Sequence, residues 1–237
     1  VGGNVNPQAD PSSHSATYCI YGGGYIHEGK TATIGGTAYT VFAGNAKANY
    51  LFGANGGPGT GEIKGGTNVT VSGGAVMSVY GGSCYGNYTG NTKVLVSGGS
   101  MEQVFGGNEG GCVTGDVKVD INGGTINVKS DSSALRTNWQ VYMNGGDVTI
   151  STKKKGIHAD SALYLRGSTI NIVTAFEGIE AFKIFAEGGV TSVFATNDGW
   201  NGGGGPKNNS SSMAMFRPVW PPRVGSRASG RSIRMIL

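Results

Sequence analysis

The sequence is poor in proline, cysteine and charged residues, and each shortage excludes a class of protein. Only 7 of 237 residues are proline, and no Gly-X-Y period accompanies the 45 glycines, so a collagen-like chain is excluded. Cys19, Cys84 and Cys112 form no CxxC pair, which argues against a zinc site or a disulfide framework. A single bridge from Cys84 to Cys112 and free thiols both stay open. No run of 18 apolar residues is present, so we expect no membrane-spanning helix.

Positive charge is also scarce outside the C-terminal tail. The formal net charge is +4, but six basic residues and no acid lie from Lys207 onward, which leaves 12 basic and 14 acidic residues in the rest of the chain. A basic groove for nucleic acid is therefore not indicated. The chain opens at Val1 without a signal peptide, so we expect a mature form or a fragment.

A repeat organises most of the chain. Short alternating segments end in Gly-Gly, as in Val69–Gly74 (VTVSGG) and Val94–Gly99 (VLVSGG). Six copies in phase start at positions 69, 94, 119, 141, 163 and 184. Alternation of apolar and polar residues predicts strands, and glycine adopts positive φ without steric cost, so Gly-Gly predicts a sharp corner. A short and regular period of this kind indicates stacked coils.

We therefore predict an all-β fold, a right-handed parallel β-helix of about 7–8 coils with about 21–25 residues in each coil. A propeller blade would need roughly 40 residues for each repeat. Alternate side chains of each strand should face a shared apolar core. Equivalent residues of successive coils should lie about 4.8 Å apart, in columns.

The organisation expected from the sequence is one continuous stack over residues 1–205 and an irregular Arg/Pro-rich tail over 206–237. In the first half an aliphatic–aromatic pair follows the glycines, as in Val41-Phe42 and Val79-Tyr80. In the second half a second strand follows them instead, so we expect the coil shape to change near residue 125. Residues 45–66 are rich in glycine and predict a loop inserted into an early coil.

Acidic and amide side chains gather at the corners of the second half. Stacking would bring Glu177 and Glu180 next to Asn197 and Asp198 of the following coil, with Asp160 nearby. Calcium takes six to eight oxygen ligands in a loosely defined shell, so these residues are candidate calcium ligands. The alternative is that the acids are solvated, or that they pair with Lys155 or His158.

These corners also carry a family resemblance. Lys155–Asp160 (KGIHAD), Gly167–Ile172 (GSTINI), Glu177–Ala181 (EGIEA) and Asn197–Asn201 (NDGWN) resemble the bacterial surface family of carbohydrate-binding, calcium-binding right-handed β-helix domains. The resemblance covers about residues 117–205 and implies a pectate-lyase-like shape and binding of acidic plant polysaccharides such as polygalacturonate. Lys154 and Lys155 stand where the family has acids.

Two kinds of side chain are candidates for sugar binding. The three lysines Lys153, Lys154 and Lys155 would contact uronate carboxylates, as would His158 and Arg136. Arg136 is in step with His158 and Glu180, one and two coils further on. Aromatic rings stack on the apolar faces of sugars, and the candidates are Trp139, Tyr142, Tyr164 and Trp200. Tyr142 and Tyr164 occupy the same place in successive repeats and should face the same side; they either bind sugar or cover the edge of the core.

The sequence thus predicts non-catalytic binding of an extracellular polysaccharide, acidic and polygalacturonate-like, with calcium as a candidate cofactor, by a bacterial surface or secreted protein. One alternative is a polysaccharide lyase on the same scaffold, with Arg136 as the base. A second alternative is a structural adhesin or stalk, because fold alone does not decide function.

Overall fold

The computed structural model describes residues 19–203, 214–216 and 231–236, and every regular element in these ranges is a β-strand. The chain divides into two compact units, residues 1–117 and 118–237. Together they hold about seven turns of a β-solenoid with parallel, stacked strands. The fold class predicted from the repeat is confirmed. The described ranges offer no helix that could cross a membrane.

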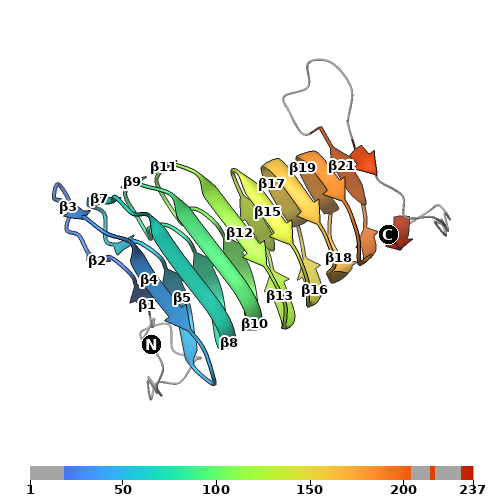
Figure 1. Ribbon diagram of the computed structural model, residues 1–237, viewed down its shortest axis with the longest axis horizontal. Coiled ribbons are helices and arrows are strands. Elements are labelled where there is room, and N and C mark those ends of the chain that lie inside the picture. The colour runs from blue at the N-terminus through green and yellow to red at the C-terminus, as the bar shows by residue number, and fades with distance from the viewer. Residues whose placement is uncertain (1–18, 204–213, 217–230, 237) are drawn as a thin grey trace. The chain divides into compact units, whose positions relative to one another are not determined.

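The strands of the first unit belong to three sheets, and Figure 1 labels most of them along the blue-to-green part of the ribbon. They are β1 (Cys19–Tyr21), β2 (Gly24–Tyr25), β3 (Thr31–Ile34), β4 (Ala38–Phe42), β5 (Lys47–Phe52), β6 (Asn55–Gly56), β7 (Thr60–Ile63), β8 (Thr67–Tyr80), β9 (Tyr88–Thr89), β10 (Thr92–Phe105) and β11 (Val113–Thr114).

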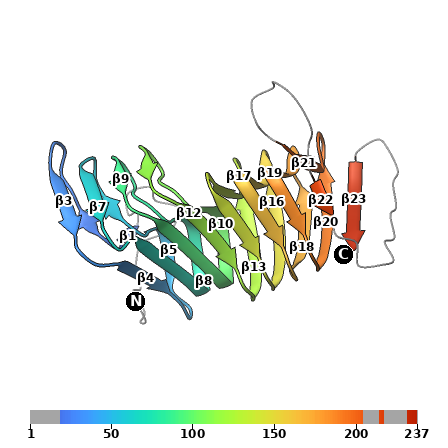
Figure 2. The same ribbon diagram turned by 45° about the horizontal axis from the view of Figure 1, so that its top comes forward.

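The second unit has shorter coils, and β12 begins at its boundary. Its strands are β12 (Val117–Ile121), β13 (Thr125–Ser130), β14 (Leu135–Thr137), β15 (Gln140–Met143), β16 (Asp147–Thr152), β17 (Lys155–Leu165), β18 (Thr169–Thr174), β19 (Glu177–Ala186), β20 (Val190–Ala195), β21 (Trp200–Gly202), β22 (Ala214–Phe216) and β23 (Arg231–Ile236). Figure 2 shows β13, β16, β18 and β20 side by side.

The alternation of apolar residues places the core as predicted. In β16 Val148 and Ile150 are buried, and they lie in register with the buried Ile170 and Ile172 of β18. Neighbouring strands of this unit are in register one repeat apart, as Val141 is with Leu163. Each inward column is therefore a continuous apolar stack, and its burial is the main source of stability.

The Gly-Gly corners of the second unit need glycine for two reasons. Gly146 has a φ of 87°, and a Cβ there would lie 2.7 Å from the backbone of the preceding corner. A side chain would therefore meet both a strained backbone and a steric clash. In the first unit β8 runs through its Gly-Gly, although Gly74 has a φ of 82°.

The prediction of an inserted loop over residues 45–66 is wrong, because this segment forms a coil with three strands. β5 pairs in parallel with β1 and β8, and β7 pairs with β3 and β9. Its glycines serve close packing: a Cβ on Gly61 would clash with the side-chain amide of the buried Asn55. Phe52 of this coil, and not Phe42, joins the stacked column of Tyr21, Tyr80 and Phe105.

The tail predicted to be irregular contains two strands. β22 pairs in parallel with β19, and β23 pairs antiparallel with β20, from Ala195 opposite Arg231 to Val190 opposite Ile236. The rest of the tail lies outside the described residues. The continuity of the stack from residue 1 to residue 205 stays a prediction.

Candidate functional site

A groove of about 450 Å³ runs along one row of corners in the second unit. It lies where β13, β16, β18 and β20 end, so each coil contributes one short segment. Three coil steps give it a length of about 14 Å. Its walls carry hydroxyl groups, two ammonium groups, one carboxylate and one aromatic ring. The lining residues are Lys129, Ser130, Asp131, Ser151, Thr152, Lys153, Thr174, Ala175, Phe176 and Thr196.

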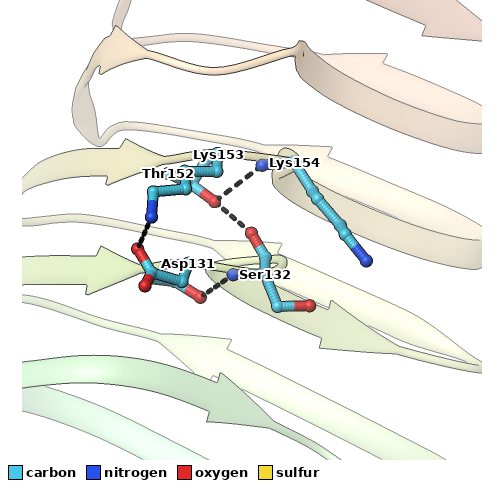
Figure 3. A network of polar contacts seen from close by, with 6 residues as sticks. Asp131, Ser132, Thr152, Lys153 and Lys154 are labelled. Atoms are coloured by element: carbon cyan, nitrogen blue, oxygen red, sulfur yellow. Dashed lines mark hydrogen bonds and ion pairs between the residues drawn. The ribbon is translucent and has the colours of Figure 1, made fainter.

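Hydrogen bonds between successive coils hold one wall of this groove (Figure 3). The hydroxyl of the buried Thr152 donates to the carbonyl of Ser132 and accepts from the amide of Lys154 at 3.3 Å. The Lys153 ammonium lies 2.9 Å from the Asp131 carboxylate, and both side chains are exposed. The backbone of this wall is therefore fixed, whereas the charged groups at its rim face solvent.

Phe176 forms the apolar part of the groove. Its side chain is 53% exposed, although its amide donates to the Lys154 carbonyl at 2.9 Å and its carbonyl accepts from the Asn197 amide at 2.8 Å. The backbone is thus tied to both neighbouring coils while the ring stays in solvent. An exposed ring on a fixed backbone is a rigid surface for an apolar ligand face.

The columns predicted at the next corner are present. Arg136 pairs in register with His158, His158 with Glu180, and Glu180 with Asn201. Lys155 pairs with Glu177, and the Glu177 carboxylate accepts from the Asn197 amide at 3.5 Å. The amide of Gly178 donates to the Asp198 carbonyl at 2.8 Å, so Asp198 continues this column. Equivalent positions of successive coils therefore lie over one another.

The Lys155 ammonium occupies the centre of this corner. It forms an ion pair with Glu180 and a second one, at 3.4 Å, with Glu177. The three side chains are mostly buried, at 31% exposure for Lys155, 16% for Glu177 and 12% for Glu180. Two carboxylates thus converge on a cation that the chain itself supplies.

The ionisation of the corner follows from these contacts. Burial, together with the contact to Glu180, raises the pKa of Glu177. Burial also acts to raise the pKa of Glu180, but hydrogen bonds from Lys155 and Glu177 outweigh it and lower that pKa. For Lys155 burial opposes the charge, yet the two glutamates raise its pKa. The charged pair of Lys155 and Glu180 is therefore the stable form.

His158 lies beside this pair. Its Nε2 is 3.1 Å from the Asp160 carboxylate, which favours the charged imidazole. Burial and the nearby Lys155 ammonium have the larger effect, so the pKa of His158 is lowered. The imidazole is thus neutral at pH 7 and makes a hydrogen bond to Asp160 rather than a full ion pair.

The corner as it stands does not fit a calcium ion between Glu177 and Glu180. The oxygens that would bind the ion face the Lys155 ammonium instead. Within residues 19–203 and the two C-terminal strands, no three His, Cys, Asp or Glu side chains are gathered in an arrangement that could hold a metal. Calcium binding at Asn197 and Asp198 stays a prediction, but Asp160 contacts His158 and lies five residues along β17 from Lys155, in another column.

Tyr142 and Tyr164 face the same side, as their places in the repeat indicate, and they stack on each other. Their ring centroids are 4.5 Å apart, and Phe185 continues the stack at 4.8 Å from Tyr164. The Lys118 ammonium lies 4.1 Å from the Tyr142 ring centroid, and the Arg166 guanidinium 4.9 Å from that of Tyr164. The ring faces are therefore largely covered by neighbours, and mainly the edges are left for a ligand.

The remaining predicted residues are spread over the outward face. Trp139 is 43% exposed and lies between β14 and β15, and Trp200 is half-buried at the start of β21. Lys153 and Lys154 are exposed at the groove rim, one corner away from Arg136. The structure thus separates the predicted set into a groove, a charged corner and an aromatic stack, and Trp139 and Trp200 belong to none of the three.

Sequence reasoning missed Lys129, Asp131 and Phe176 of the groove. Lys129 lies near the end of β13, and Asp131 and Phe176 follow the second strand of their coils, outside the two repeated motifs. The constant repeat length could have predicted this row of residues, because Lys129 lies opposite Ser151, and Ser130 opposite Thr152.

A family model described as carbohydrate-binding domain-containing protein matches residues 107–203. The match covers less than half of the chain, but it includes the groove, the charged corner and the aromatic stack. Neither the curated proteins nor the solved structures contain a match to this sequence. The match supports carbohydrate binding by this stretch of the chain.

Proposed function

We propose that the second unit binds a polysaccharide without cleaving it, and that the groove along β13, β16, β18 and β20 is the binding site. The observation that carries this proposal is the composition of the groove. Hydroxyl groups from successive coils can exchange hydrogen bonds with sugar hydroxyls, and the exposed ring of Phe176 offers an apolar surface to a sugar face. The family match to residues 107–203 supports the same ligand class.

The charges of the groove favour an acidic glycan. Lys129 and Lys153 lie in its wall, Lys154 is exposed at its rim, and Asp131 is the acid among the lining residues. Since Asp131 pairs with Lys153, the groove retains a positive balance. Uronate carboxylates placed every few ångströms along a chain would meet these ammonium groups as point charges. A polygalacturonate-like ligand is therefore preferred over a neutral one.

A ligand of this kind is met outside the cell, so we expect the protein to act there or at the bacterial surface. Assistance by calcium belongs to the same proposal as a further step, in which an ion at Asn197 and Asp198 would bridge the protein and a uronate. The binding experiment is therefore run both with calcium and with a chelator.

The test is isothermal titration of the full chain with polygalacturonate at low salt, compared with a variant that carries Lys129→Gln and Lys153→Gln. Each exposed ion pair contributes up to about 1 kcal/mol, so the double variant should bind about tenfold more weakly. The affinity of the unchanged protein should also fall as salt is added, because exposed charges are screened. Phe176→Ala should weaken binding with little change in salt dependence.

A charge-matched control replaces Lys30 and Lys64, two exposed lysines of the first unit, by Gln. The proposal is wrong if this control loses as much affinity as the groove variant, or if the groove variant binds like the unchanged protein. Ultraviolet absorbance of the same mixtures measures unsaturated product: a steady rise would favour the lyase. An absence of both binding and product would favour the structural stalk.

A further inference from the structure

Two exposed aromatic side chains lie two coils apart on the outward face of the second unit. Trp139 precedes β15, and its carbonyl accepts hydrogen bonds from the amides of Ser161 at 3.0 Å and Ala162 at 3.2 Å. Ser161 is therefore the residue that lies next to Trp139 in the following coil. A serine in this position leaves space where a large side chain would otherwise cover the indole.

A β-bulge places Phe182 on the other side of Ser161. In the pairing of β17 with β19, Ala159 faces Ala181 and Ala162 faces Lys183. Asp160 and Ser161 together are therefore opposite the single residue Phe182. Bulges re-aim side chains, and here the Phe182 ring is 50% exposed. The order along the stack is Trp139, Ser161 and Phe182, which spans two coil steps, about 9.6 Å.

The neighbouring stack of Tyr142, Tyr164 and Phe185 shows how far apart two rings lie when they are one coil step apart. Rings on adjacent coils lie 4.5 and 4.8 Å apart, so they touch and leave no room between them. Two rings separated by two steps and by a small residue leave a slot. A flat ligand in van der Waals contact with both rings needs about 7–8 Å between the ring planes, or two contacts of about 3.5–4.0 Å. The two-step spacing of about 9.6 Å is wider than this, so it leaves room for a puckered ring, which is thicker than a flat one.

Charged residues flank the slot along the chain, because Asp160 precedes Ser161 and Lys183 follows Phe182. Asp160 has a side chain that is 47% exposed, and the Lys183 ammonium lies 6.0 Å from the Phe182 ring centroid. The carboxylate accepts and the ammonium donates hydrogen bonds, which is what the equatorial hydroxyls at the rim of a sugar ring require. The slot thus combines two apolar walls with polar groups at its edges.

We propose that this slot holds one pyranose ring, with its two apolar faces against Trp139 and Phe182 and its hydroxyls near Asp160 and Lys183. The site rests on the proposed function, and it adds a subsite that reads the ring of the sugar rather than its carboxylate. Because apolar contact is insensitive to salt, this subsite should bind acidic and neutral pyranosides alike.

The proposal is tested by a substitution that fills the slot. Ser161→Phe places a third ring between Trp139 and Phe182, and the three rings should then stack like the neighbouring tyrosines. We expect the variant to keep the melting temperature of the parent and to lose about tenfold in affinity for galacturonate and cellulose hexasaccharides at 0.5 M NaCl. Ser161→Ala keeps the slot open and should bind like the parent. If Ser161→Phe does not fold, Trp139→Leu and Phe182→Leu test the same walls at exposed positions.

The outcomes separate this proposal from the previous one. Loss in Ser161→Phe together with binding by Ser161→Ala supports the slot. If the parent binds polygalacturonate through Lys129 and Lys153 but Ser161→Phe and both leucine variants bind as the parent does at high salt, the slot is wrong and the groove stands. If the parent binds neither hexasaccharide nor polygalacturonate, both proposals are wrong.

Discussion

Replacement of Lys155 by Met tests whether the charged corner depends on its internal cation. Methionine keeps the unbranched length of the side chain and removes its charge. The substitution leaves Glu177 and Glu180 facing each other, with 16% and 12% of their side chains exposed. Two carboxylates in such a position repel each other, and solvent reaches them poorly.

The expected loss of stability follows from the burial of the three side chains. Removal of one partner from a fully buried ion pair costs about 3–5 kcal/mol. Because 31% of the Lys155 side chain is exposed, solvent screens part of this, and a loss of about 2 kcal/mol is expected. For a domain of this size 1 kcal/mol corresponds to roughly 2–4 °C, so the melting temperature should fall by about 4–8 °C at pH 7.

Thermal unfolding followed by circular dichroism measures this loss. Without the ammonium, the pKa of the glutamate pair rises in the folded state. A raised carboxyl pKa destabilises the fold as pH increases through it, so the difference between variant and parent should shrink at pH 4 and be full at pH 7. Adding Glu180→Gln to the variant should restore part of the stability, since one of the two charges is removed.

The exposed neighbour Lys154 supplies the control, because Lys154→Met should leave the melting temperature unchanged. Added calcium should stabilise Lys155→Met more than the parent, since the vacated place is surrounded by carboxylate oxygens. An unchanged melting temperature for Lys155→Met at pH 7 would refute the reasoning. So would an equal loss in Lys154→Met.

Two further predictions concern the first unit. Cys84 is buried, donates to Glu109 at 3.2 Å, and has its pKa raised to about 12 by burial, so the thiol stays protonated at pH 8. A thiol reagent should label the exposed Cys112 first and Cys84 only after unfolding, as peptide mapping would show; equal labelling of both would contradict this. Thr92→Val deletes a buried hydrogen bond of 2.6 Å to the Gly106 carbonyl and should cost about 1–2 kcal/mol in denaturant unfolding. Unchanged stability would argue against that bond.

The sequence was sufficient to predict the fold wherever the period stayed constant. In the second unit the constant repeat step places Arg136, His158 and Glu180 in one column, and the strands confirm it. The structure also leaves the two thiols of Cys84 and Cys112 free, which decides between the two alternatives that their spacing left open.

Features that break the period could not be predicted. Residues 45–66 were predicted to be a loop because they are rich in glycine, but glycine serves close packing in this coil. In addition, Cys19 of β1 is in register with Tyr50 of β5, and this spacing is longer than the repeat predicts. The exposed position of Phe182 could not be predicted, because a bulge shortens the repeat partway along the pairing of β17 with β19. The choice of Lys155 as partner for Glu177 and Glu180 depends on side-chain positions that a column alone does not specify.

The antiparallel pairing of β23 with β20 has a consequence for solubility. A stack of parallel coils ends in a row of unpaired backbone amides and carbonyls. This edge could pair with a coil from any other copy of the chain. The strand from Val190 to Ala195 instead pairs with a strand of reversed direction, which interrupts the parallel pattern. A chain shortened before residue 231 should therefore expose the backbone edge of β20 and associate end to end more readily than the full chain.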